Sequence, residues 1–370
     1  MFATLEGRPV DRFPVAVPYI FLLQCDHWCE ITGQPAWTYY AWQIQEPAEH
    51  VKAYADFDQK LPFDILQPIV ARSREEREAL EIIQKDGQHY YYDRRTGQMI
   101  WLNEDLPHSA SGPNQTRYVF DRKDVQQHVV VRSASELLAS GRYDFIQAAR
   151  EAFPDKFILN GVIGTFYQCT WYVGETNLFS LLYDDPDLIH YLSQRILEQT
   201  IEEIRALATA GDDAIYVDDA LTTCDMISVD FYERFSFPYV KAMVDEIHAL
   251  GKKAVLIYFG GVMDRVKQIA SLRADSLIVE TSMKSYVNNL AEIAAKVGDS
   301  ICLWGNIDPI GVVQNGTDED LRRAIVEQVA IGKRVGRFII STGSPITPLT
   351  PLPRIRRFID LAHELGALTP

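Results

Sequence analysis

The chain has 370 residues, of which 47% are hydrophobic and 24% charged, a globular composition that excludes disordered, collagen-like and low-complexity architectures. Asp and Glu together number 51 and Lys and Arg 36, and the resulting net charge of −15 disfavours nucleic acids and anionic membranes as partners. With no run of about 18 apolar residues and with Glu6 and Asp11 near the start, we expect neither a transmembrane helix nor a secretory signal. Five cysteines in a chain this long do not indicate a disulfide framework, which favours the reducing cytoplasm.

Eight short apolar segments, rich in β-branched residues, alternate with amphipathic segments along the chain. Such continuously apolar runs are typical of parallel strands that are buried on both faces. We expect strands at residues 15–19, 63–67, 156–163, 214–218, 254–258, 276–280, 301–304 and 337–341.

The segment between the second and third expected strands, about residues 70–130, is interpreted as an insertion. Residues 75–85 have a helical pattern. Residues 89–93 and 98–102 flank Arg94-Arg95-Thr96-Gly97, which predicts a β-hairpin with glycine in the left-handed turn position. Residues 103–130 are predicted to be an irregular polar loop.

Helices are predicted at residues 231–250, 286–297 and 318–331, each followed by a glycine that can end a helix. Thr317 is a suitable N-cap for the last of them. Alternating strands and helices predict an α/β protein with a single closed (β/α)₈ TIM barrel over residues 1–370, including the inserted hairpin and an N-terminal helical segment. A doubly wound open sheet is the alternative, but no Gly-rich dinucleotide turn follows any strand.

In such a barrel the functional residues lie at the C-terminal ends of the strands. Several carboxylates stand there, and acids that share a cleft perturb one another and suit proton transfer or cation binding. They are Asp64, Asp218, Asp219, Glu280 and Asp308. The alternative is that about half of them cap the following helices, and Asp308, which precedes Pro309, is interpreted as a turn residue.

Aromatic residues near the same strand ends indicate a wide apolar pocket for a flat ligand, with core packing as the alternative. They are Tyr19, Trp28, Trp37, Tyr167, Trp171, Tyr172 and Tyr258. The stretch from Cys25 to Cys29 includes His27, and a thiolate and an imidazole can share a zinc ion. Cys25 and His27 are therefore the candidate ligands, but with no second distant pair we expect buried thiols and no metal. No other histidine falls at a strand end, so serine or cysteine triad chemistry is not predicted.

Five segments, spread over nearly the whole chain, resemble the uroporphyrinogen decarboxylase superfamily, which includes the decarboxylase itself and corrinoid-linked methyltransferases. They are residues 7–15 (GRPVDRFPV), 161–175 (GVIGTFYQCTWYVGE), 227–241 (ISVDFYERFSFPYVK), 305–309 (GNIDP) and 341–355 (STGSPITPLTPLPRI). The resemblance implies a single barrel with a deep cleft at its C-terminal end. The hairpin at 89–102 is similar to one in the methyltransferase branch.

Departures from the family patterns narrow the implied activity. Asp64 and Tyr172 match decarboxylase site positions. However, the loop at residues 21–33 contains no Arg or Lys where the decarboxylase has an Arg-rich loop, and Ser344 replaces its histidine. An acidic, aromatic cavity without guanidinium groups should repel a polycarboxylate. The zinc-dependent thiol methyltransferases have a His-x-Cys pair and a further Cys, where this chain has Ile257, Phe259 and Ser344, so zinc activation of a thiol is not expected.

The resemblance then implies a corrinoid-dependent methyltransferase, in particular an O-demethylase that acts on a methoxylated aromatic compound or another small methyl donor. The corrinoid would be carried by a separate protein, with no cofactor bound tightly to this chain. The expected catalytic residues are Asp219, Glu280, Tyr172, Tyr258 and Asp64. The expected substrate-binding residues are Tyr19, Trp171, Tyr167, Asp218, Asn306 and Ser344.

Two alternatives stay open. One is uroporphyrinogen decarboxylation, driven by protonation of a pyrrole carbanion near Asp64. The other is a non-catalytic binding protein, which the absence of the His-x-Cys and Cys zinc ligands supports. The sequence indicates neither the identity of the methyl donor nor the oligomeric state.

Overall fold

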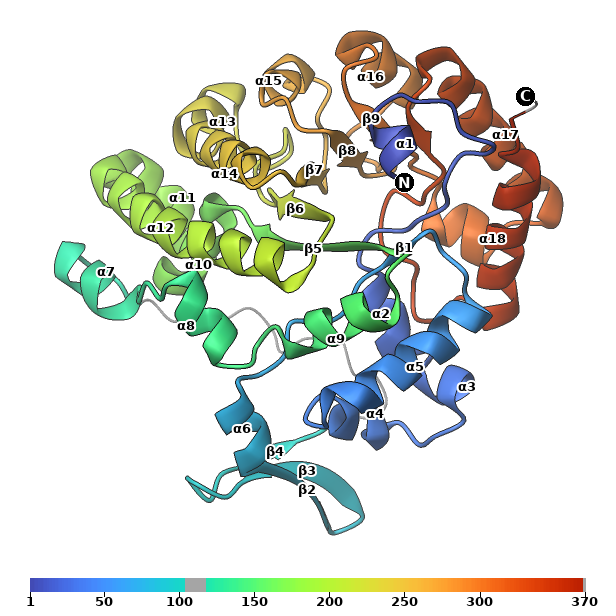
Figure 1. Ribbon diagram of the computed structural model, residues 1–370. Coiled ribbons are helices and arrows are strands. Elements are labelled where there is room, and N and C mark those ends of the chain that lie inside the picture. The colour runs from blue at the N-terminus through green and yellow to red at the C-terminus, as the bar shows by residue number, and fades with distance from the viewer. Residues whose placement is uncertain (104–117, 369–370) are drawn as a thin grey trace.

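A curled parallel sheet of seven strands lies at the centre of the molecule (Figure 1). The computed structural model describes residues 1–103 and 118–368. Neighbouring strands follow the order β1-β5-β6-β7-β8-β9-β10. Their bounds are β1 (Ile65–Leu66), β5 (Phe157–Ile163), β6 (Ala214–Asp218), β7 (Lys253–Tyr258), β8 (Ser276–Val279), β9 (Cys302–Trp304) and β10 (Phe338–Ile339).

The first expected strand, at residues 15–19, is not a regular strand. Val15 forms a single parallel bridge with Ile340, and its carbonyl accepts a hydrogen bond of 2.9 Å from the backbone of Asp64. This segment therefore lies between the edge strands β10 and β1. Pro14 and Pro18 flank it, and because proline has no N–H it cannot extend a strand ladder. The closed eight-stranded barrel is thus not confirmed, and the residues that the structure describes form a sheet of seven strands.

Side chains alternate between the two faces of the sheet, as the strand period of two requires. Inside the curl, a buried apolar cluster includes Ala214, Ile257 and Trp304. Ile215 and Val217 belong to a larger cluster between the sheet and the helices. This alternation decides which residues at the strand ends face the inside of the curl and which face the helix layer.

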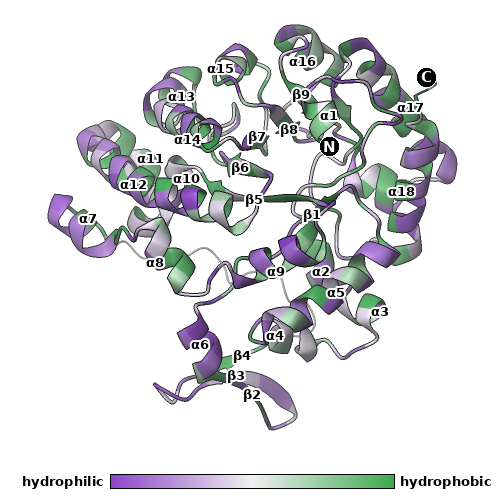
Figure 2. Cartoon of the chain, viewed as in Figure 1, coloured by the Kyte–Doolittle hydropathy of each residue, from purple (hydrophilic) through white to green (hydrophobic). Residues whose placement is uncertain are grey.

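Helices surround the convex face of the sheet, with predominantly hydrophilic outer surfaces (Figures 1 and 2). No helix in the described part of the chain has the length and apolar content that a membrane span requires. The helices are α1 (Phe2–Leu5), α2 (Ile20–Asp26), α3 (Trp28–Thr32), α4 (Trp37–Trp42), α5 (Pro47–Lys60), α6 (Arg74–Ala79), α7 (Arg122–His128), α8 (Ala134–Ala139), α9 (Asp144–Ala152), α10 (Thr165–Val173), α11 (Glu175–Asp184), α12 (Pro186–Ala210), α13 (Val229–Phe235), α14 (Phe237–Ala249), α15 (Val266–Ser271), α16 (Leu290–Val297), α17 (Asp318–Val335) and α18 (Leu352–Leu365), with a short π-helix η1 (Pro309–Gln314).

Several predicted helix boundaries are wrong for identifiable reasons. The helix expected at 231–250 is two helices, α13 and α14, which meet at Ser236, and Pro238 lies in the first turn of the second. The last predicted helix continues past Gly332. A Cβ at this position would lie 2.9 Å from the Phe13 ring, so Gly332 serves close packing, and α17 ends at Gly336, where φ is 76°.

The insertion forms a separate three-stranded antiparallel sheet, β2 (Leu80–Lys85), β3 (Gln88–Asp93) and β4 (Met99–Trp101), that projects from the body with α6 (Figure 1). The predicted hairpin between β3 and β4 is confirmed. The predicted helix at 75–85 is wrong in its second half, because Asp86 and Gly87, both with positive φ, turn the chain into an additional hairpin. The loop expected at 103–130 contains α7, and its residues 104–117 lie outside the described part of the chain.

Candidate active site

A tyrosine and an aspartate form a hydrogen-bonded pair at the C-terminal end of β6, on the inner face of the sheet. The Tyr19 hydroxyl donates to Oδ2 of Asp218. Asp218 is 7% exposed, and its buried Oδ1 has no hydrogen-bond partner among the described residues. Burial raises the pKa of Asp218 to about 6, although the Tyr19 hydrogen bond opposes the shift. The carboxyl group therefore keeps its proton up to about pH 6, and its buried Oδ1 is left without a hydrogen bond from the described residues.

Aromatic rings surround this pair. The Tyr19 ring lies 5.9 Å from the ring of Tyr216 and 5.4 Å from that of Phe259, measured between centroids. Tyr19 adopts a left-handed backbone conformation with φ of 51°. Such a conformation costs free energy in a bulky residue and is found mainly where function or packing demands it. Tyr19 thus lies on the inner face beside Asp218 in a strained backbone conformation, and its role in ligand binding stays a prediction.

Glu280 is the second carboxylate on the inner face, at the end of β8. Ser344 Oγ donates to its Oε1 at 2.9 Å, and the Tyr286 hydroxyl donates to its Oε2. Asn306 Nδ2 donates to the backbone oxygen of Glu280 at 3.5 Å. The structure therefore brings together three of the expected residues, Glu280, Asn306 and Ser344. One strand, β7, separates β8 from β6, which places the backbones of Glu280 and Asp218 at least about 10 Å apart.

Asp219 and Tyr258 face the helix layer and not the inner face of the sheet, because successive residues along a strand point to opposite faces. Asp219 is fully buried in the helix layer, where Ser236 Oγ lies 2.8 Å from each carboxylate oxygen. The Tyr258 hydroxyl lies 2.9 Å from that of Tyr232. Burial raises the pKa of Asp219 to about 7. This arrangement corrects the expectation that both adjacent aspartates lie at the strand mouth.

Asp219→Asn is expected to weaken the dependence of stability on pH. The folded-state pKa of about 7 lies above the usual value of 3.8, so the folded protein binds this proton more tightly and loses stability as the pH rises from about 4 to 7. Asparagine has no such proton, and the slope between pH 5 and 7 should fall by up to about 1.4 kcal/mol per pH unit. Urea unfolding at pH 5, 6, 7 and 8 measures this; an unchanged slope would contradict it.

Asp64 lies at the opposite, N-terminal end of the sheet, which corrects its expected position. Arg12 forms two hydrogen bonds of 2.7 Å with its carboxylate oxygens. Burial alone would raise the pKa of Asp64, but hydrogen bonds from Arg12 and the Val15 backbone, together with His363 Nε2 at 3.5 Å, outweigh it and lower the pKa below the usual value. Asp64 precedes β1 rather than following it, and the N-terminal ends of barrel strands are associated with stability.

Three of the remaining expected aromatics lie on α10, which follows β5, whereas Trp28 and Trp37 lie on α3 and α4 among the N-terminal helices. The Tyr167 and Trp171 rings are 6.1 Å apart, and Trp171 is 44% exposed. Tyr172 packs against the core of the helix layer, and burial raises the pKa of its hydroxyl. Tyr167 and Trp171 are therefore available to a ligand, whereas Tyr172 faces away from the Tyr19–Asp218 pair.

A cavity of about 320 Å³, here called the side cavity, opens between β5, α10, α12 and the loop before α9. It is lined by Val70, Leu137, Arg142, Tyr143, Gly161, Val162, Ile163, Gln168, Trp171, Glu203, Leu207 and Tyr216. Arg142 corrects the expectation of a cavity without guanidinium groups. The sequence could have predicted that Tyr216 faces inward, because it lies two residues before Asp218 on the same strand. No local sequence pattern indicates that Arg142 or Glu203 lines a cavity.

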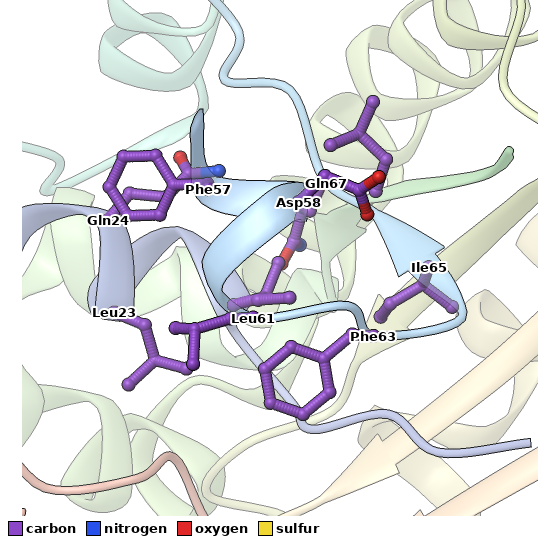
Figure 3. Close-up of a pocket in the computed structure, with 10 residues that line it drawn as sticks. Leu23, Gln24, Phe57, Asp58, Leu61, Phe63, Ile65 and Gln67 are labelled. Carbon is purple, nitrogen blue, oxygen red and sulfur yellow. The ribbon is translucent and has the colours of Figure 1, made fainter. Parts of the chain in front are cut away.

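A second, much smaller cavity lies between α2, α5 and β1 (Figure 3). Its volume is about 20 Å³, and its wall is mostly apolar, with Leu23, Phe57, Leu61 and Phe63 among the lining residues. Oε1 of Gln24 is buried beside it without a hydrogen-bond partner among the described residues. A space of this size accommodates about one water molecule, so it is not a substrate site.

No group of three or more His, Cys, Asp or Glu side chains within the described ranges is arranged to hold a metal ion. Of the two candidate ligands, Cys25 is buried, and burial raises the pKa of its thiol to about 12. His27 Nδ1 lies 2.8 Å from a carboxylate oxygen of Glu30. Cys25 and His27 therefore have local partners in the N-terminal helices.

Comparisons with known proteins agree with this architecture. The chain is 25% identical over 238 residues to the methylcobamide:CoM methyltransferase MtbA of Methanosarcina mazei, and the match covers 61% of this chain and 65% of that protein, slightly less than two thirds of its length. It is 24% identical over 271 residues to the uroporphyrinogen decarboxylase of Tolumonas auensis, covering 70% and 73%.

A solved structure of a methyltransferase from Methanosarcina mazei superposes with a TM-score of 0.70 at 19% identity, over 99% of this chain and 97% of the other, which shows the shared fold. The family model described as uroporphyrinogen decarboxylase (URO-D) matches residues 105–365. This match covers more than half of the chain, which therefore belongs to the uroporphyrinogen decarboxylase family.

Proposed function

We propose that this protein transfers a methyl group from a small methylated molecule, in particular an aromatic methyl ether, to a corrinoid carried by a separate protein. The observation that carries the proposal is the Tyr19–Asp218 pair, a buried acid with one unpartnered oxygen among aromatic rings. The similarity to methylcobamide:CoM methyltransferases supports the choice of acceptor.

A methyl ether is a poor methyl donor, because its leaving group is an alkoxide or phenoxide. When it docks, the corrinoid supplies a cobalt nucleophile that accepts the methyl carbon. Asp218 supplies the proton: the carbon–oxygen bond breaks, its electron pair stays on oxygen, and that oxygen takes the proton from Oδ1. Tyr19 orients the carboxyl group through its hydrogen bond to Oδ2. Solvent then returns the proton to Asp218.

The other residues at the strand ends are proposed to bind and orient the donor. The rings of Tyr19, Tyr167 and Trp171 provide apolar contact. Glu280, Asn306 and Ser344 form the polar side of the site.

The charges at this end of the sheet favour this reaction over uroporphyrinogen decarboxylation. A porphyrinogen would bring its several carboxylates toward Asp218 and Glu280. Like charges in a partly buried site repel each other strongly, so this substrate would require several guanidinium groups nearby. Among the described residues, the inward-facing groups of the Tyr19–Asp218 and Glu280 clusters are acids, hydroxyls, amides and aromatic rings.

Mixing the purified protein with cob(I)alamin and a panel of methoxylated aromatics and methylamines tests the proposal. The absorbance change that accompanies cobalt methylation is the readout, and mass spectrometry of the demethylated product is the check. We expect turnover with at least one aromatic methyl ether. Absence of demethylation across the panel, with an active corrinoid protein also supplied, would refute the proposed reaction.

A further inference from the structure

The side cavity connects the inner face of the sheet with the helix layer, and its two ends differ in character. At the inner end lies Tyr216, two residues before Asp218 on the same face of β6. Its ring packs directly on the backbone of Gly161, where an added Cβ would lie 2.3 Å from the ring. Glycine at this position therefore lets Tyr216 occupy the space beside β5. The volume of about 320 Å³ lies at the lower end of the range for small-ligand sites, roughly 300–1,000 Å³.

At the outer end of the side cavity lies Arg142, in the loop between α8 and α9. Its side chain is exposed, and its guanidinium group forms no hydrogen bond or ion pair with the described residues. Many other arginines of this protein are paired, for example Arg12 with Asp64 and Arg150 with Asp213. An unpaired guanidinium beside a cavity is suited to bind a carboxylate of a ligand.

The wall between these two ends combines an aromatic ring and an acid. Trp171 is 44% exposed although it lines the cavity, so a flat ligand can cover it. Glu203 of α12 also lines the cavity, and Gln199 Nε2 donates to its Oε1 at 3.0 Å. Burial raises the pKa of Glu203, while Gln199 and Arg142 oppose the shift. Burial thus favours the uncharged form of Glu203, which can donate a hydrogen bond to a ligand, over the charged form, which repels an anion.

We propose that the side cavity binds a methyl donor with a single aromatic ring and one carboxylate. The carboxylate pairs with Arg142, the ring lies against Trp171, and the methylated group points past Tyr216 toward Asp218. This inference rests on the proposed methyl transfer for the identity of the reacting group, but the binding mode can be tested without a corrinoid. The single guanidinium group of Arg142 can pair with one carboxylate, so the side cavity suits a donor with one carboxylate better than a polycarboxylate. Arg72, which lines an adjoining hollow with Arg142, lies over the Tyr91 ring.

Isothermal titration calorimetry with 4-methoxybenzoate and its neutral analogue 4-methoxybenzamide tests the assignment. Wild-type protein should bind the carboxylate about tenfold more tightly than the amide, as one additional charge-assisted contact provides. Arg142→Gln should abolish this preference and leave the affinity for the amide unchanged. Arg323→Gln is the matched control, since Arg323 is an exposed residue of α17 paired with Asp320, and it should keep the preference. Thermal unfolding confirms that the variants are folded.

A second variant probes the acid in the wall. Glu203→Gln keeps the shape of the side chain and removes its negative charge, so at pH 8 it should strengthen binding of 4-methoxybenzoate. Each of three results would overturn the binding mode. The wild type could bind 4-methoxybenzoate and 4-methoxybenzamide equally, or the preference for the carboxylate could survive in Arg142→Gln. The third is that Glu203→Gln binds 4-methoxybenzoate more weakly than the wild type at pH 8. Selective binding without methyl transfer would instead refute the proposed reaction, and transfer from carboxylated donors that Arg142→Gln leaves unaffected would refute only the carboxylate assignment.

Discussion

Replacing Asp218 with Asn is expected to lower the rate of demethylation by about 10²- to 10⁴-fold, the usual contribution of a positioned general acid. Asparagine has nearly the same shape and can still accept the hydrogen bond from Tyr19, but it has no proton to give to the leaving oxygen. With a pKa of about 6, the wild-type acid should lose its proton, and the enzyme its activity, as the pH rises through 6. The residual rate of the variant should not show this decline.

Initial rates from pH 5 to 8, measured with an excess of cob(I)alamin, provide the comparison. Asp56→Asn is a suitable control, since Asp56 is an exposed residue of α5 that should leave the rate unchanged. A variant at position 218 that keeps more than one tenth of the activity, or that shows the wild-type pH profile, would show that Asp218 is not the acid.

Arg265→Met is expected to destabilise the fold by about 3–5 kcal/mol, the cost of breaking a buried charged network. Arg265 is fully buried and donates to the backbone oxygens of Thr222 and Ile227, so it fixes the loop that follows Asp218. Its guanidinium also lies over the Tyr232 ring, 5.4 Å from the centroid. Methionine would fill much of the volume but leave both carbonyl groups buried without a donor.

Urea denaturation at pH 7 measures this loss. Arg265→Lys keeps the charge but, as a single ammonium group, is a poor substitute for the forked guanidinium, so it should have an intermediate stability. A loss of less than about 1 kcal/mol in the methionine variant, within the range of ordinary surface substitutions, would contradict the role assigned to Arg265.

The strand positions of the C-terminal two thirds were predictable because continuously apolar segments have few alternatives to buried parallel strands. The orientation of the site residues can also be derived from the sequence, because it follows from the alternation of side chains along each strand. The alternation along β6 and β7 separates Asp218 from Asp219 and Phe259 from Tyr258, so only the first of each pair faces inward. Counting alternate residues back from each strand end distinguishes the inward-facing residues from those that face the helix layer.

Other features depend on contacts between distant segments. Arg142 and Glu203 come from a loop and from the middle of a long helix, and only the folded chain brings them to the same cavity. Asp64 lies at the N-terminal end because β1 begins only at Ile65, and Arg12 from a distant segment pairs with it there. The pattern of residues 80–85, which form β2, is compatible with both a helix and a strand, and pairing with β3 decides between them.

The most direct measurement offers the protein two substrates in parallel: uroporphyrinogen alone, and an aromatic methyl ether together with cob(I)alamin. Product analysis by liquid chromatography and mass spectrometry follows both. Methyl transfer predicts a demethylated phenol and a methylated cobalamin in the second reaction and unchanged uroporphyrinogen in the first. Loss of carboxyl groups from uroporphyrinogen, with the methyl ether intact, would contradict it.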